Sequence, residues 1–267
     1  MKNLSIISLF FIGLLFASCD KETPLPDPQP QPSNTGSIVF KFAHNVNGLA
    51  LVKDSMMYTN TAGNKYEINE IKYFISDVIL HNANGTYYSI SNTDKHYVDN
   101  DIASTLTWNV GDNIPEGSYD SITFTFGITM AKNISNMFVN APEIYMAWPE
   151  PLGGGYHYLM MNGKWEKAVD TINNFNFHIG IGQTYDGLGN IIGFVDNAFK
   201  VKLPASAFSI STSQTRVIQI VMNIESWFNS PIVWDFNIQG ENIMQSQSAM
   251  SDACKNGADA FSIGYIN

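Results

Sequence analysis

Alternation of apolar and polar residues runs through the chain from Ser37 onward, and this period of two constrains the fold more than any other feature. In the first segment Ile38, Phe40, Phe42 and His44 fall on one face of an extended strand, while Lys41 falls on the other. A strand with one apolar face needs a second layer to cover that face. The pattern therefore predicts strands that pack around a shared core.

Further segments repeat this pattern, and turn residues separate them. The predicted strands are 73–81, 86–90, 121–129, 156–161, 174–179, 198–203, 216–223 and 232–236. The turn sequence Asn-Ala-Asn-Gly at 82–85 predicts a hairpin between the first two of these. The best helical segment is 243–253, which is followed by Asn256 and Gly257 as a stop signal. Together the many short strands, their turn residues and the single helical segment predict an all-β protein. The expected fold is an antiparallel β-sandwich of a single domain with few short helices.

The N-terminal segment predicts export and a lipid anchor. Lys2 precedes an apolar run at 6–16 that has the length of a signal-peptide core. The run ends in Ala17-Ser18-Cys19, which resembles a bacterial lipobox, with Phe16 where leucine is usual. The alternative is a plain secretory signal with a cysteine there by chance.

These features divide the chain into three parts. We expect a signal peptide at 1–18, a lipidated Cys19 with a proline-rich tether at 19–36, and the sandwich domain at 37–267. The expected location is the bacterial cell envelope, as an outer-membrane lipoprotein that faces the periplasm or the cell surface. The lipid anchor would provide its membrane contact.

Charge and cysteine content narrow the classes of partner. The formal net charge is −10, and the signal peptide contributes only one charged residue, Lys2. An acidic surface argues against nucleic acid as a partner. Only Cys19 and Cys254 occur, so a lipidated Cys19 would leave Cys254 unpaired, with no disulfide framework to support the fold.

The five histidines are the residues best suited to chemistry, since no phosphate loop, HExxH, CxxC or GxSxG motif occurs. His44 closes an apolar strand face, His157 follows three glycines, and His178 lies opposite the aromatic face of its strand. His81 and His96 have the sequence context of surface residues. A histidine on an inward face is more often a core residue than a ligand. The eleven methionines supply soft sulfur, and imidazole with thioether favours copper, although methionine is usually core filler.

An ordered set of segments resembles the MbnP-like copper-binding family. The segments are FKFAH at 40–44 with Gly48, IKYFISDV at 71–78, ITFTFGI at 122–128 with Asn133, MAWP at 146–149 leading into GGYHY at 154–158, and FNFH at 175–178. The resemblance implies an exported β-sandwich, often a lipoprotein. It also implies one copper ion bound by two histidines and a kynurenine, an oxidised tryptophan. In some systems a di-haem partner enzyme makes that oxidation.

Carried over to this sequence, the resemblance assigns His44 and His178 to the family's histidines and adds His157 as a third metal-ligand candidate. Trp148, Met146 and Met160 are candidates for residues beside the site. If Trp148 is not the oxidised residue, the site would consist of histidines alone, consist of histidine and methionine, or be absent. We expect each ligating ring to be oriented by an acceptor on its other nitrogen. Binding should weaken below about pH 6.5, where an ordinary imidazole becomes protonated.

Three functions follow, and the first is favoured. It is a non-enzymatic, extracytoplasmic lipoprotein that binds copper for uptake, storage or delivery. The second is a surface module for glycan or protein, which would need an exposed row of Trp and Tyr side chains. The third is a hydrolase, for which Glu143, Glu150, Asp170 and Asp186 flank the glycine-rich region without a diagnostic spacing.

Overall fold

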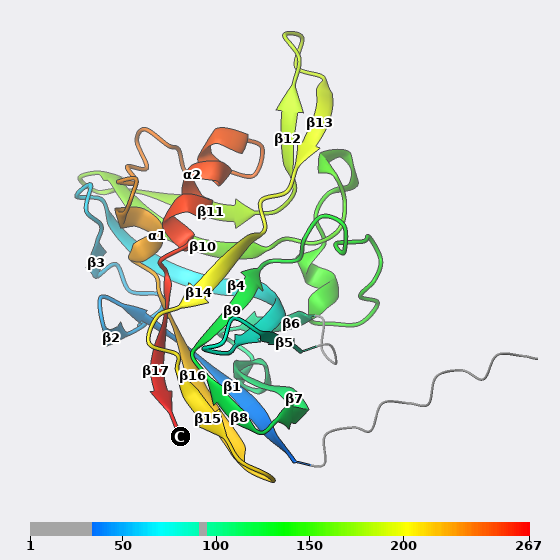
Figure 1. The fold of residues 1–267 in the computed structure, drawn as a ribbon. Coiled ribbons are helices and arrows are strands. Elements are labelled where there is room, and N and C mark those ends of the chain that lie inside the picture. Colours follow the sequence, from blue (N-terminus) through cyan, green and yellow to red (C-terminus); the bar gives the residue numbers. More distant parts are fainter. Residues whose placement is uncertain (1–33, 91–94) are drawn as a thin grey trace, which may run out of the picture. The chain divides into compact units, whose positions relative to one another are not determined.

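A computed structural model describes residues 34–90 and 95–267. The predicted signal peptide, Cys19 and all but the last residues of the predicted tether lie outside these ranges. Figure 1 shows the described chain as strands with two short α-helices. Among the described residues no helix is long and apolar enough to cross a membrane.

One sheet forms around the first strand. Its order is β17–β16–β1–β2, with β7 also paired to β1. These strands are β1 (Thr35–Val46), β2 (Leu49–Ala50), β7 (Thr107–Pro115), β16 (Thr215–Asn223) and β17 (Phe261–Ile266). The β1–β16 pair is parallel, whereas the other pairs in this sheet are antiparallel.

The second sheet carries the candidate site. Its order is β11–β10–β4–β9–β14, and β3, β5 and β6 also pair with the long strand β4. The strands are β3 (Tyr58–Thr59), β4 (Lys65–His81), β5 (Tyr87–Ser89), β6 (Lys95–Asp99), β9 (Ser121–Phe126), β10 (Leu159–Ala168), β11 (Thr171–Ile179) and β14 (Phe199–Leu203). All of its pairs are antiparallel.

The remaining elements are short. Two ribbons pair β12 (Gly182–Tyr185) with β13 (Ile191–Val195) and β8 (Gly117–Tyr119) with β15 (Phe208–Ile210). The α-helices are α1 (Ser226–Asn229) and α2 (Gln247–Gly257), and the 3-10 helices are η1 (Ala103–Leu106), η2 (Glu143–Met146) and η3 (Glu150–Leu152).

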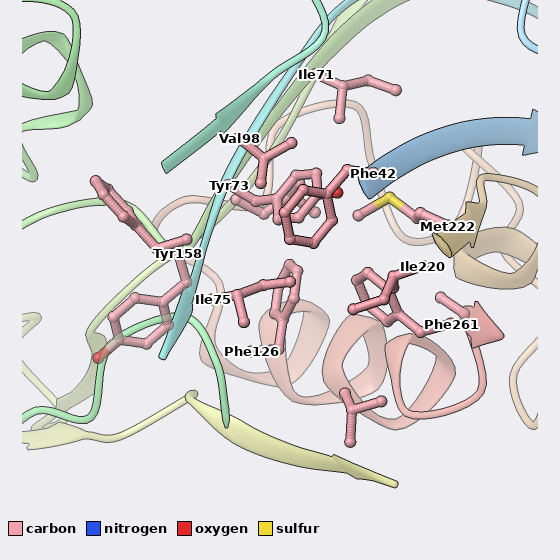
Figure 2. Packing of buried hydrophobic residues seen from close by; sticks show 14 of the residues in the cluster. Phe42, Ile71, Tyr73, Ile75, Val98, Phe126, Tyr158, Ile220, Met222 and Phe261 are labelled. Carbon is pink, nitrogen blue, oxygen red and sulfur yellow. The ribbon is translucent and has the colours of Figure 1, made fainter. Parts of the chain in front are cut away.

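The two sheets face each other across an aromatic core (Figure 2). Phe42 of β1 packs edge-on against Tyr73 of β4, with ring centroids 6.4 Å apart. Phe261 of β17 packs against Phe124 of β9 at 5.3 Å. Burial of these rings supplies the main favourable free energy of a fold that has no disulfide in its described part. The expected β-sandwich is therefore confirmed.

The hairpin and most of the expected strands are present, but 232–236 is not a strand. Its backbone bonds to side-chain amides and to the Phe228 carbonyl of α1 instead of to a neighbouring strand. Asn60 Nδ2 donates to the Trp234 carbonyl at 2.9 Å, and the Phe236 and Ile232 amides donate to Asn64 and Asn256 at 3.0 and 2.9 Å. An apolar run predicts burial, but it does not reveal which partners satisfy the backbone.

The expected helix at 243–253 is shifted toward the C-terminus. It begins at Gln247 because Ser246 caps it, the Ser246 hydroxyl accepting from the Ala249 amide at 3.3 Å. Ile243 is buried outside the helix, and its amide bonds to the Asn176 carbonyl of β11.

Candidate metal site

His178 is placed by the pleat of β11. Its neighbours Phe177 and Ile179 are both buried in the core between the sheets. Because successive side chains of a strand point to opposite faces, His178 points to the outer face of its sheet. Met160 of β10 is its direct cross-strand partner and shares that face.

His157 reaches the same region from the glycine-rich segment that precedes β10. Gly153, Gly154 and Gly155 have φ values of 117°, 65° and 79°, which side chains rarely adopt. A Cβ atom at Gly155 would lie 2.6 Å from the Asn133 carbonyl oxygen. The His157 amide then bonds to the Met146 carbonyl at 2.7 Å. The glycine run in the sequence is thus a conformational requirement of the loop that positions His157.

The rings of His157 and His178 are in contact. Their centroids lie 5.1 Å apart and their planes are nearly perpendicular, at 85°. Two imidazoles that bind one metal at about 2 Å per nitrogen have ring centres roughly 5 to 6 Å apart. The spacing of this pair is therefore compatible with a shared metal ion.

One nitrogen of each ring is committed to a protein acceptor. His157 Nδ1 lies 2.9 Å from the Met146 carbonyl oxygen, which can only accept, so Nδ1 carries the proton. His157 Nε2 is buried and has no hydrogen-bond partner among the described residues. His178 Nε2 lies 2.7 Å from Asn162 Oδ1, which leaves Nδ1 as the nitrogen with a free lone pair. In metal sites, such a hydrogen bond to one ring nitrogen orients the histidine and leaves the other nitrogen for the metal.

Burial keeps both rings neutral. It lowers the pKa of His157 to about 4, and the backbone contacts with Met146 and Ala147 oppose the shift. It lowers the pKa of His178 to about 3, and the adjacent His157 lowers it further. Neutral imidazole is the form that binds metals.

Trp148, Met146 and Met160 surround this pair in different ways. The Trp148 ring lies 4.7 Å from that of His157, and its Nε1 donates to the Leu152 carbonyl at 3.0 Å. Met146 is fully buried and contributes its carbonyl oxygen. Met160 is half-buried beside His178. All three candidates from the sequence therefore lie next to a histidine of the pair.

A pocket of about 520 Å³ opens beside His178. It is lined by Asn176, His178, Asn242, Met244 and Gln245. Met244 brings a second thioether to the pocket that His178 lines. The sequence gives no indication of this contribution. The segment that contributes Met244 runs alongside β11, because the Asn176 amide and carbonyl bond to Glu241 and Ile243.

His44 lies on the opposite side of the sheet that carries His178. Its ring packs edge-on against Tyr73 at 5.7 Å, within the core between the sheets. Across the strands, Leu159 of β10 pairs with Tyr73 on one side and with Ile179 on the other. Ile179 points into the core and its neighbour His178 points outward, so Tyr73 and His178 lie on opposite faces of the sheet. The structure therefore brings His157 and His178 together but does not bring His44 to them. Ligation of a metal by any of the three stays a prediction.

His44 is buried within the core. Neither ring nitrogen has a hydrogen-bond partner among the described residues. Burial lowers the pKa of His44 to about 4, and a weaker interaction with the Asn100 side chain opposes the shift. These are the properties of a neutral core histidine.

The remaining two histidines differ from each other. His81 bonds through Nε2 to the Thr123 hydroxyl at 2.9 Å. His96 is not the surface residue expected, since it stacks on Trp108 with centroids 4.9 Å apart and donates to the Thr105 carbonyl at 2.8 Å. Burial accordingly lowers the pKa of His96.

The histidine pair has no third histidine, cysteine or carboxylate beside it in the described part of the chain. Across 34–90 and 95–267 no group of three or more His, Cys, Asp or Glu side chains is arranged to hold a metal ion. A metal on the histidine pair would complete its coordination with other donors, such as the thioethers of Met160 and Met244. Imidazole and thioether are ligands that suit copper.

The fold and site define a β-sandwich in which a buried and a half-buried histidine meet on the outer face of one sheet. Residues 35–250 match the model of the MbnP family, and the chain belongs to that family. Its fold is similar to the solved structure of MbnP from Methylosinus trichosporium, with 14% identity and a TM-score of 0.51. That match covers 86% of this chain and 98% of the other. No curated protein matches this chain.

Proposed function

We propose that this protein binds one copper ion through His157 Nε2 and His178 Nδ1, for copper uptake, storage or delivery outside the cytoplasm. The observation that carries the proposal is the contact between two neutral imidazoles at 5.1 Å, each with one nitrogen held by a protein acceptor. Membership of the MbnP family supports copper as the metal. The protein acts as a binder rather than as an enzyme.

The rest of the site fits a soft metal. Met160 lies opposite His178 on the neighbouring strand and Met244 lines the pocket, so both offer thioether sulfur near the ring. The pocket also gives an ion a route to His178. Trp148 touches His157, so it is the tryptophan best placed for oxidation by a di-haem partner enzyme. The peptide that contains Trp148 should then have a changed mass in protein from the native host.

The proposal places the protein in the bacterial cell envelope, attached through a lipid on Cys19. The alternative of a glycan-binding surface is less well supported. All five tryptophans, Trp108, Trp148, Trp165, Trp227 and Trp234, are buried and cannot form an exposed stacking row.

Copper titration of the purified domain tests the proposal. A competition assay with a Cu(I) chelator should give one saturable site for the unsubstituted protein. His157→Ala and His178→Ala should each abolish it, because a single imidazole cannot replace the pair. His81→Ala is the matched control, since His81 bonds to Thr123 at the far end of β4 and should leave the affinity unchanged. Unchanged copper affinity in His178→Ala would refute the proposed site.

A further inference from the structure

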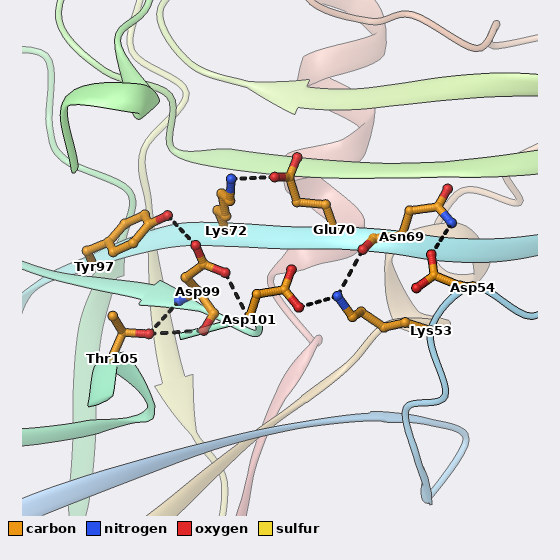
Figure 3. A network of polar contacts seen from close by, with 9 residues as sticks. All are labelled: Lys53, Asp54, Asn69, Glu70, Lys72, Tyr97, Asp99, Asp101 and Thr105. Atoms are coloured by element: carbon orange, nitrogen blue, oxygen red, sulfur yellow. Dashed lines mark hydrogen bonds and ion pairs between the residues drawn. The ribbon is translucent and has the colours of Figure 1, made fainter. Parts of the chain in front are cut away.

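A chain of polar side chains crosses the outer face of the second sheet and ends at His178. Lys72 forms an ion pair with Glu70 Oε1, as Figure 3 shows for these two residues of β4. Asn162 of β10 donates through Nδ2 to Glu70 Oε2 at 2.6 Å. Asn162 Oδ1 then faces His178 Nε2 at 2.7 Å. The chain thus links three strands, β4, β10 and β11.

The contact with Glu70 fixes the orientation of the Asn162 amide. A carboxylate oxygen accepts hydrogen bonds and cannot donate them, so the amide nitrogen must face Glu70. A rotated amide would place two oxygens 2.6 Å apart with no proton between them. The oxygen of Asn162 is therefore the atom that meets His178.

The orientation of Asn162 in turn fixes the proton of His178. An amide oxygen only accepts, so Nε2 must carry the proton that joins them. The lone pair of His178 then resides on Nδ1. In His157 the Met146 carbonyl has the opposite effect, because it holds the proton on Nδ1 and leaves Nε2 free.

We propose that Glu70 and Asn162 are positioning residues that select Nδ1 of His178 as its metal-binding nitrogen. The ligating role of Nδ1 depends on the proposed function, whereas the tautomer and ring orientation do not. Glu70 and Lys72 are only 28% and 20% exposed, so their side chains are partly shielded from solvent. The two histidines consequently present different nitrogens to a shared ion.

Nitrogen-15 NMR of the metal-free protein is the first test. His178 should appear as the Nε2–H tautomer, with an Nε2 proton that exchanges slowly with water because Asn162 accepts it. Asn162→Leu removes the acceptor, and that proton signal should disappear through solvent exchange. A His178 that carries its proton on Nδ1, or an Nε2 proton that persists in Asn162→Leu, overturns the inference.

The second test uses Cu(I), which is diamagnetic, added to the same labelled protein. The Nδ1 resonance of His178 should shift on binding, and Nε2 should keep its proton. Asn162→Leu should bind Cu(I) about 10- to 100-fold more weakly, the usual effect of losing an outer-shell partner. Asn174→Leu, on the same face of β11 roughly 13 Å along the strand, is the matched control and should bind normally. Coordination through Nε2 contradicts the proposal.

A double variant that exchanges the carboxylate and the amide tests whether weaker binding in Asn162→Leu reflects only a loss of structure. In the double variant Glu70→Gln with Asn162→Asp, the carboxylate next to His178 still accepts from Nε2, and the glutamine can donate to it. Both the slow Nε2 proton and copper affinity within a few-fold of the original should return. A double variant as weak as Asn162→Leu would overturn the inference. No saturable copper site in the unsubstituted protein would refute the proposed function, and the ligating role of Nδ1 with it, whatever the tautomer.

Discussion

The ring of His157 stands at 85° to the ring of His178, with their centroids 5.1 Å apart. Opposite protonation accompanies this geometry, because Met146 holds a proton on Nδ1 of one ring and Asn162 holds a proton on Nε2 of the other. Burial lowers the pKa of both rings, so both are neutral at pH 7 without a metal. The pair therefore offers two neutral nitrogens to a metal cation, and its low pKa values disfavour the binding of protons.

Copper binding should persist to a lower pH than free histidine allows. Protons compete with the metal only below the pKa of each ring, and these values are about 4 for His157 and about 3 for His178. Affinity should stay constant from pH 7 to about 5 and decline below about 4, unlike the decline below about 6.5 expected of ordinary imidazoles. Chelator competition across this range, corrected for the chelator's own protonation, measures it. A tenfold loss between pH 7 and 6 would contradict the lowered pKa values.

His44→Leu should make the protein more resistant to acid. The folded pKa of His44 is about 4, below the usual 6.5, so the unfolded chain takes up the proton first. The contribution of neutral His44 to the free energy of unfolding is fully present above about pH 6.5. It decreases by up to about 3 kcal/mol as the pH falls toward 4. Urea unfolding at pH 7 and pH 4.5 should show a smaller difference for the leucine variant.

The same variant separates His44 from the histidine pair. Its copper affinity at pH 7 should equal that of the unsubstituted protein, because His44 lies across the sheet from His178. Loss of the copper site in folded His44→Leu would restore His44 as a ligand.

Gly180→Ala should destabilise the protein through Trp148. An added Cβ at position 180 would lie 2.6 Å from the Trp148 ring, so the indole must move within a close-packed site. We expect a cost of about 1 to 3 kcal/mol in the free energy of unfolding. Gly187→Ala is the control, since its Cβ would meet nothing within 4 Å. Equal denaturation midpoints for the two variants would exclude this packing constraint.

Cys19→Ala should release the protein from membranes, because the predicted lipid is its only expected anchor. Fractionation of the native host's cells measures the change. Cys254→Ala should remain in the membrane fraction, since Cys254 is an unpaired thiol whose pKa burial raises to about 12. Membrane retention of Cys19→Ala would refute the lipoprotein prediction.

Most of the segments that local periodicity predicts lie on strands, but the prediction failed where partners are distant in sequence. The strands β11, β14 and β16 follow alternation that can be read directly along the chain, whereas the predicted segment 73–81 is only the second half of β4. The segment 232–236 has a similar apolar pattern, yet its backbone is held by Asn60, Asn64 and Asn256. No local pattern reveals such partners, because each lies outside the segment it supports.

The site shows the same division. The glycines before His157 predicted a special conformation, and the alternation of Phe177, His178 and Ile179 placed His178 opposite the core. The contribution of Asn162 and Glu70 was missed, since it depends on the register between three strands. A polar residue at 162, directly after two methionines, is the signal that the sequence offers for Asn162.

The sequence by itself determined the all-β class, the faces of His44 and His178, and the family resemblance. These follow from local chemistry, because side-chain alternation is a property of one strand. Tertiary structure alone decided that His157 meets His178 while His44 packs against Tyr73 on the other side. The physical reason is that sheet order and register decide which side chains become neighbours. His44 lies in the core and His178 on the outer face, so the second sheet itself separates them.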